Sequence, residues 1–160
     1  MTEVVLRPGT ADDIPTLLGF IRELAEYEKE LDKVEATEEG LRHFLFGPEP
    51  KAKTLVMEVD GTPVGSAFYF YFFATYRGKP GIYLEDIYIQ PPYRGLGIGK
   101  KVFAHLAGEV RDSGGYFLRW WVENGNESGI GFYEALGSRR ERQHTLYHLE
   151  DDALDRLLDD

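Results

Sequence analysis

A shift in the hydrophobic pattern of residues 82–89 constrains the fold more than any other feature of the sequence. Apolar residues occupy even positions up to Leu84 and odd positions from Ile87 onwards. Side chains alternate between the two faces of a strand, so a strand with one apolar face shows such a shift only if it contains an extra residue. The pattern therefore predicts a β-bulge at Glu85 and Asp86, where a side chain is redirected and backbone N–H groups leave the ladder.

A glycine-rich loop follows this strand. Pro91 and Pro92 end the strand because neither has an N–H group to donate, and glycines then occupy alternate positions at Gly95, Gly97 and Gly99. A helical pattern comes next. Glycines allow several backbone N–H groups to surround one anion, and the helix dipole adds to the attraction. The sequence predicts a phosphate site here, and the alternative is a turn that binds nothing.

The spacing of the loop excludes two common nucleotide sites. A dinucleotide-binding fingerprint needs two residues between its second and third glycines, and only Ile98 separates Gly97 from Gly99. A P-loop needs Ser or Thr after its Gly-Lys pair, and Lys101 stands there instead.

The rest of the chain predicts a mixed α/β fold. Short apolar runs alternate with helical patterns and with turn residues. Strands are expected at residues 4–7, 54–59, 63–73, 82–89, 117–122 and 145–149, a loop at 76–81, and helices at 11–28, 37–46, 95–111, 126–136 and 150–158. Asp60-Gly61 predicts a hairpin between the second and third strands.

Composition limits the class of protein. A length of 160 residues suits one domain, residues 1–160, and the absence of cysteine excludes a thiol nucleophile. No signal peptide or membrane-spanning run is present, so a cytoplasmic protein that binds no membrane is expected. The net charge of −10 argues against a nucleic-acid partner, and either solubility or a cationic partner accounts for it.

The glycine loop resembles that of a known family. The residues from Arg94 to Gly99 are similar to the coenzyme A pyrophosphate loop of the GNAT N-acetyltransferases, and residues 126–137 are similar to the last conserved motif of that family. Residues 22–29 and 83–88 resemble the diamine acetyltransferases, which include the spermidine/spermine and thialysine enzymes. The resemblance covers nearly the whole chain. It implies the GNAT fold, a mixed and mostly antiparallel sheet flanked by helices, and a homodimer.

The resemblance also implies a set of binding residues. The residues expected to contact acetyl-CoA are Ile87, Tyr88, Ile89, Arg94, Gly95, Leu96, Gly97, Ile98, Gly99, Lys100, Asn126, Glu127, Ser128, Gly129 and Tyr133. Those expected to contact a small amine substrate are Tyr27, Glu28, Glu85, Asp86, Arg119, Trp120 and Trp121.

Two residues are candidates for proton transfer. Glu85, at the expected bulge, is a candidate base for the amine, and the alternative is an exposed strand carboxylate. Tyr133 resembles the family's general acid, and its ordinary pKa of about 10 lets it protonate a departing thiolate of pKa about 8.5. Without cysteine the amine is expected to attack the thioester directly.

The first helix ends with an acidic cluster. Glu23, Glu26, Glu28 and Glu30 lie where the helix dipole repels negative charge. A contact with a cationic substrate is one explanation for them.

Two departures from the diamine acetyltransferases bear on the substrate. Thr75 stands near the position of an aspartate in the polyamine enzyme, and His144 stands near that of a tryptophan. A thialysine-like amino acid therefore fits at least as well as a polyamine. A protein N-terminal or lysine acetyltransferase and a catalytically silent acetyl-CoA-binding module are the alternatives. The four histidines are scattered, so no metal is expected.

Overall fold

The computed structural model describes residues 2–159, and its contacts divide the chain into two compact units, Met1–Trp121 and Val122–Asp160. The first unit contains the whole sheet and three of the helices. The second contains the two remaining helices. Whether the chain forms the expected single domain stays a prediction.

The sheet of the first unit has the strand order β1-β2-β3-β4-β5. Neighbours from β1 to β4 are antiparallel, and β5 runs parallel to β4. The strands are β1 (Val4–Pro8), β2 (Lys53–Val59), β3 (Thr62–Ala74), β4 (Lys79–Ile89) and β5 (Leu118–Arg119). This open mixed sheet confirms the predicted fold class.

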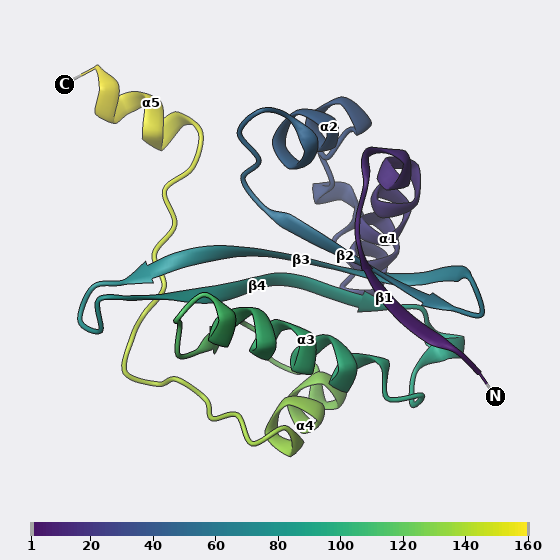
Figure 1. Ribbon diagram of the computed structural model, residues 1–160. Helices are drawn as coiled ribbons and strands as arrows, with labels where there is room; N and C mark the ends of the chain where they lie inside the picture. Colours follow the sequence, from purple (N-terminus) through teal and green to yellow (C-terminus); the bar gives the residue numbers. More distant parts are fainter. Residues whose placement is uncertain (1, 160) are drawn as a thin grey trace. The chain divides into compact units, whose positions relative to one another are not determined.

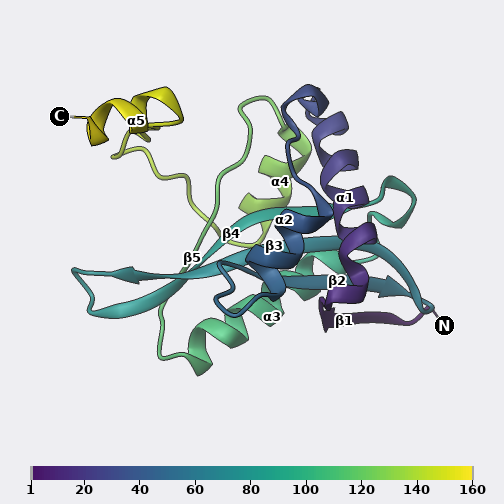
Figure 2. The same cartoon turned by 90° about the horizontal axis from the view of Figure 1, so that it is seen from above.

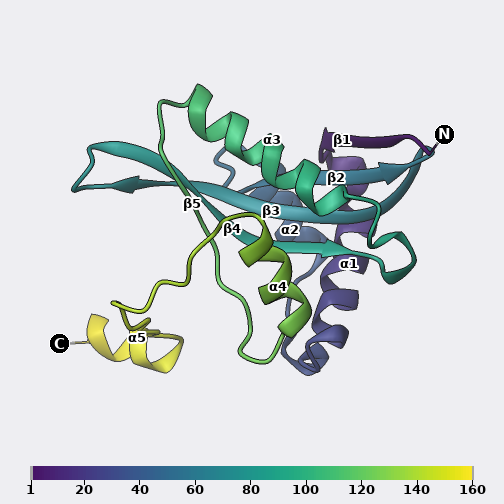
Figure 3. The same cartoon turned by 90° about the horizontal axis from the view of Figure 1, so that it is seen from below.

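Helices cover both faces of the sheet. Within the first unit, α1 and α2 lie over one face and α3 lies over the other, as Figures 1 and 3 show. The helices of the first unit are α1 (Ile14–Tyr27), α2 (Glu38–Phe46) and α3 (Ile98–Asp112), with short 3₁₀ segments η1 (Ala11–Asp13), η2 (Leu31–Lys33) and η3 (Pro91–Tyr93). The second unit has α4 (Glu127–Ala135) and α5 (Asp152–Leu158).

Each face of the sheet buries its own apolar side chains. On the α1 face, Leu17, Val56 and Phe68 form a buried cluster. Burying side chains of this size contributes about 1.5–3 kcal/mol each. The strand β3 crosses beneath α1 and α2 in the view from above (Figure 2). The helix α3 buries Val102 and Leu106, which repeat at helical spacing.

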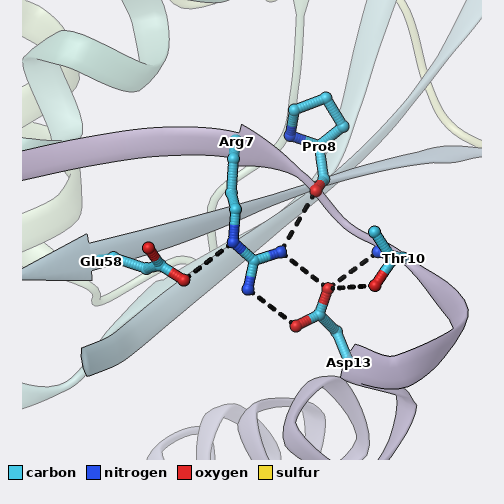
Figure 4. Close-up of polar contacts among 5 residues, drawn as sticks. All are labelled: Arg7, Pro8, Thr10, Asp13 and Glu58. Carbon is cyan, nitrogen blue, oxygen red and sulfur yellow. Dashed lines mark hydrogen bonds and ion pairs between the residues drawn. The ribbon is translucent and has the colours of Figure 1, made fainter. Parts of the chain in front are cut away.

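A polar cluster fixes the start of α1 to the sheet (Figure 4). The guanidinium of Arg7 on β1 donates two hydrogen bonds of 2.8 Å to the carboxylate of Asp13 and one of 2.8 Å to Glu58 on β2. Asp13 also accepts hydrogen bonds from the backbone N–H and hydroxyl of Thr10. These hydrogen bonds, above all that from Arg7, hold the pKa of Asp13 well below its usual range. The start of α1 is therefore anchored to β1 and β2.

The structure confirms the predicted bulge. Phe68 on β3 is opposite Asp86, and Tyr69 is opposite Leu84, so Glu85 is the extra residue of β4. The predicted hairpin is also present, with Asp60 and Gly61 at φ of 50° and 76°. Two positive φ angles are typical of the tight turn that joins antiparallel strands.

The predicted bounds of β4 and β5 were wrong. The loop expected at 76–81 ends earlier, because β3 and β4 continue their pairing as far as Ala74 and Lys79. The strand expected at 117–122 is reduced to Leu118–Arg119, because β4 supplies pairing to these two residues only.

The prediction of a strand at residues 145–149 was wrong. This segment has no regular secondary structure, and its Leu146 and Tyr147 are 71% and 88% exposed. An alternating pattern becomes a strand only where a neighbouring strand accepts and donates backbone hydrogen bonds. Among the described residues, none pairs with this segment.

Candidate active site

The bulge in β4 places two carboxylates next to each other with different environments. Glu85, the extra residue, is exposed, whereas Asp86 is half-buried. Burial and the nearby charge of Glu85 raise the pKa of Asp86 from 3.8 to about 6. A carboxyl group with a pKa close to neutrality is well suited to exchange protons near physiological pH.

Asp86 lines a pocket between α1, η2 and β4. The pocket has a volume of about 140 Å³. Its walls combine three carboxylates, one lysine and four apolar residues: Glu28, Glu30, Asp86, Lys33, Ile21, Leu24, Ala25 and Val34. Carboxylates on an apolar surface match a ligand that has ammonium groups on a hydrocarbon chain.

The end of α1 turns the chain back across this pocket. Lys29 has a φ of 61°, its N–H donates to the carbonyl of Glu26, and the N–H of Glu30 donates to the carbonyl of Ala25. This is a Schellman ending in which a lysine takes the usual glycine position. A left-handed conformation costs a residue with a Cβ atom roughly 1–2 kcal/mol. The two hydrogen bonds hold this turn in spite of its strain, and strained residues of this kind are common at functional sites.

The glycine loop has the geometry that an anion site requires. Gly95 and Gly97 have φ of 80° and 77°, and a Cβ atom added at either would point into open space. Gly97 is also the N-cap of α3. The first N–H groups of a helix have no partner within the helix. The backbone can thus approach a phosphate from this side, and the loop fits the pyrophosphate of coenzyme A.

Arg94 stabilises the start of the loop. Its Nε donates a 2.8 Å hydrogen bond to the carbonyl of Ile89, and its guanidinium lies 5.0 Å from the ring of Tyr27 and 5.9 Å from that of Tyr88. These contacts connect the loop to α1 and to the end of β4. The predicted residues Tyr27, Tyr88, Ile89 and Arg94 therefore lie together.

A second contact joins α1 to the end of β4. The side-chain amide of Gln90 donates to both carboxylate oxygens of Glu23, at 3.2 and 3.1 Å. Part of the acidic end of α1 therefore has a structural role, and Glu28 and Glu30 are the members that reach the pocket.

The predicted substrate-binding residues on β5 and directly after it do not line this pocket. Arg119 lies 5.1 Å from the rings of Phe72 and Phe117, and the ring of Trp120 lies 4.9 Å from that of Phe103. Trp121 is 50% exposed. A role of Arg119, Trp120 and Trp121 in substrate binding stays a prediction.

The second unit contains the other part of the predicted cofactor site. Asn126 caps α4, where its Oδ1 accepts a 3.0 Å hydrogen bond from the N–H of Gly129. Tyr133 is half-buried within α4, and its ring lies 5.4 Å from that of Phe132. The carbonyl of Tyr133 accepts a 2.7 Å hydrogen bond from the hydroxyl of Ser138. The role of Tyr133 stays a prediction.

Sequence reasoning missed part of the pocket. Lys33 and Val34 lie in and after a short 3₁₀ segment that has no periodic pattern, so no signal identified them. Glu30 was indicated only by its unfavourable position near a helix end.

The described residues show neither a metal-binding cluster nor a membrane-spanning helix. Among residues 2–159, no group of three or more His, Asp or Glu side chains is arranged to hold a metal ion. The described helices include none with the length and apolar character to cross a membrane.

Comparison with known proteins identifies the family. The acetyltransferase (GNAT) family matches residues 17–137. The chain is 40% identical over 147 residues to a thialysine N-epsilon-acetyltransferase of Bos taurus, covering 87% of this chain and 86% of that protein. It is 30% identical over 151 residues to the spermidine/spermine N(1)-acetyltransferase-like protein 1 of Homo sapiens, covering 90% of this chain and 22% of that protein.

Solved structures agree on the fold. An integron cassette protein from the mobile metagenome of V. cholerae superimposes with a TM-score of 0.82 at 23% identity, covering 98% of both chains. The family match spans residues of both compact units. The chain therefore belongs to the acetyltransferase (GNAT) family, resembles its diamine acetyltransferases, and is an N-acetyltransferase.

Proposed function

We propose that this enzyme transfers the acetyl group of acetyl-CoA to a primary amine of a small cationic molecule, either a diamine or polyamine or a thialysine-like amino acid. The observation that carries the proposal is the pocket, in which Glu28, Glu30 and Asp86 surround apolar side chains of α1. The similarity to enzymes named for thialysine and for spermidine and spermine supports the same class of substrate.

The pocket matches both parts of such a substrate. The carboxylates accept charge-assisted hydrogen bonds from ammonium groups. Ile21, Leu24 and Ala25 provide an apolar wall for the methylene groups between two amines. A substrate with an ammonium group on a hydrocarbon chain is thus bound at its charged end and along its length.

The two carboxylates of the bulge deprotonate the amine. An ammonium group cannot attack a carbonyl carbon until it loses a proton. Asp86, with its pKa raised to about 6, is largely ionised at neutral pH and accepts the proton inside the pocket. Glu85 raises the proton affinity of Asp86 and, from its exposed position, passes the proton to water.

The glycine loop binds the acetyl donor, and Tyr133 protonates its leaving group. Acetyl-CoA supplies the thioester whose carbonyl carbon the neutral amine attacks. Backbone N–H groups from Gly95 to Lys100 bind the pyrophosphate, together with the positive end of α3. Tyr133 donates its phenolic proton to the departing sulfur.

Turnover of acetyl-CoA against polyamines, diaminocarboxylic acids, aminoglycosides and peptides tests the proposal. Tyr133→Phe is expected to lower the maximal rate by roughly 10²- to 10⁴-fold with little change in acetyl-CoA affinity. Glu85→Gln is expected to lose most activity at low pH, where few amines are already neutral. Turnover of peptides alone would contradict the small-molecule assignment, and unshifted pH profiles with near-normal rates would contradict the catalytic roles.

We further propose a cytoplasmic homodimer. The supporting observation is the aromatic surface of β3, on which Tyr71 and Phe73 are 40% and 65% exposed. Two exposed aromatic side chains at alternate positions of one strand offer ring surface that a second subunit would bury. Light scattering at micromolar concentration tests it, and a monomer mass would rule out the dimer.

A further inference from the structure

The pocket contains one positively charged side chain among its described residues, that of Lys33. A site for purely cationic molecules gains nothing from a lysine in its wall, because like charges repel. The binding of a diamine or polyamine therefore does not account for Lys33.

The position of Lys33 is fixed by the chain that crosses the pocket. The N–H of Lys33 donates to the carbonyl of Glu30 at 2.9 Å, and the N–H of Val34 donates to that of Leu31 at 3.2 Å. This 3₁₀ turn follows directly on the strained ending of α1. The backbone therefore holds Lys33 at the pocket.

The ammonium group of Lys33 forms an ion pair with Glu30 that a ligand can replace. The side chain of Lys33 is 67% exposed and that of Glu30 is 40% exposed. Exposed pairs at this spacing are weak because solvent screens them. A carboxylate on a bound ligand could take the place of Glu30, and it would gain from the partial exclusion of water.

The pocket thus presents charges of both signs. Asp86 on β4 and Glu28 at the C-cap of α1 offer negative charge, and Lys33 on η2 offers positive charge from a different element. A diamine meets the carboxylates but is repelled by Lys33. The corresponding diaminocarboxylic acid carries a carboxylate in addition to its two ammonium groups, so it can place its distal ammonium group against the carboxylates of the pocket and its own carboxylate against Lys33.

We propose that Lys33 is a specificity-determining residue that binds the carboxylate of the substrate, so that the enzyme acetylates diaminocarboxylic acids in preference to the corresponding diamines. The inference rests on the proposed function, because it assumes that the amine is bound in this pocket. It narrows the substrate to amines that also carry a carboxylate.

Substrates that differ only in the carboxylate test the inference. The ratio of kcat/KM for lysine to that for cadaverine, and for ornithine to that for putrescine, is measured for the wild type, Lys33→Gln and Lys33→Arg. The wild type is expected to prefer the amino acids. Lys33→Gln is expected to lower this preference by roughly 3- to 10-fold through KM, and Lys33→Arg to retain most of it.

A matched control separates this effect from a general loss of positive charge. Lys51 is 65% exposed and forms an ion pair with Glu49, but lies outside the pocket, so Lys51→Gln is expected to leave both ratios unchanged. Equal ratios in the wild type and Lys33→Gln, with all four amines acetylated, would overturn the role of Lys33 alone. Failure of the wild type to acetylate any of them would overturn the proposed function as well.

Discussion

Replacement of Asp86 by asparagine is expected to stabilise the protein at neutral pH and to inactivate it. In the folded protein, burial and Glu85 raise the pKa of Asp86 from 3.8 to about 6. The unfolded chain restores the ordinary pKa, so the folded state binds the proton more tightly. The difference corresponds to about 3 kcal/mol, by which ionised Asp86 lowers the free energy of unfolding above about pH 6.

The sign of the pH dependence follows from the same shift. Below about pH 4 the carboxyl group is protonated in both states and the penalty disappears, and between about pH 4 and pH 6 it grows as only the unfolded state ionises. An asparagine amide remains neutral throughout. The variant is therefore expected to be more stable than the wild type by about 1–3 kcal/mol at about pH 7.5, and by less than about 1 kcal/mol at about pH 4.

Urea unfolding of both proteins at these two pH values measures the difference. Glu85→Gln is the control, because it removes an exposed charge beside Asp86 and is expected to gain less. The maximal rate of Asp86→Asn is expected to fall by roughly 10²- to 10⁴-fold, as for a lost general base. An asparagine variant that is no more stable than the wild type at neutral pH, or equally stabilised at both pH values, would refute the reasoning.

Three further changes have defined outcomes. Gly97→Ala is expected to weaken acetyl-CoA binding about tenfold or more in calorimetry, because a methyl group enters the open space beside the loop; Gly61→Ala, also left-handed and open, is expected to cost only stability, roughly 1–2 kcal/mol. Tyr69→Phe removes a part-buried 2.6 Å hydrogen bond to the carboxylate of Glu109 and is expected to cost about 1.5–3 kcal/mol in urea unfolding. Asp13→Asn is expected to cost about 1.5–3 kcal/mol at neutral pH in urea unfolding. This loss shrinks as the pH falls below about 4, because the ionised carboxylate stabilises the fold fully only above its unfolded pKa and loses this effect as the pH falls towards its depressed pKa in the folded protein.

The sequence predicted those features that depend on local chemistry. The bulge at Glu85 was visible because a period of two changes phase when one residue is inserted. The hairpin at Asp60 and Gly61 follows from the left-handed conformations that these residues favour. In each case the signal lies within a few residues of the feature.

The features that were missed depend on contacts between distant residues. Glu109 on α3 accepts hydrogen bonds from the hydroxyls of Tyr69 and Tyr71 on β3, and Lys53 on β2 lies 3.2 Å away. No spacing in the sequence indicates this cluster, because three elements must first be assembled. The same reason explains why Lys33 was missed and why residues 145–149 were expected to form a strand.

The two ends of α1 have opposite effects on the stability of the helix. At the C-terminal end, Glu26 and Glu28 face the negative end of the helix dipole, at a cost of about 0.3–1 kcal/mol each, and the left-handed Lys29 adds roughly 1–2 kcal/mol. At the other end, Arg7 and Asp13 form two short charge-assisted hydrogen bonds that tie the first turn to β1. Removing the anchor is therefore expected to loosen the pocket as well as the helix start, because one rigid helix carries both. The acidic end thus opposes the stability of the helix that presents it, and the proposed binding of an amine is the role that would account for it.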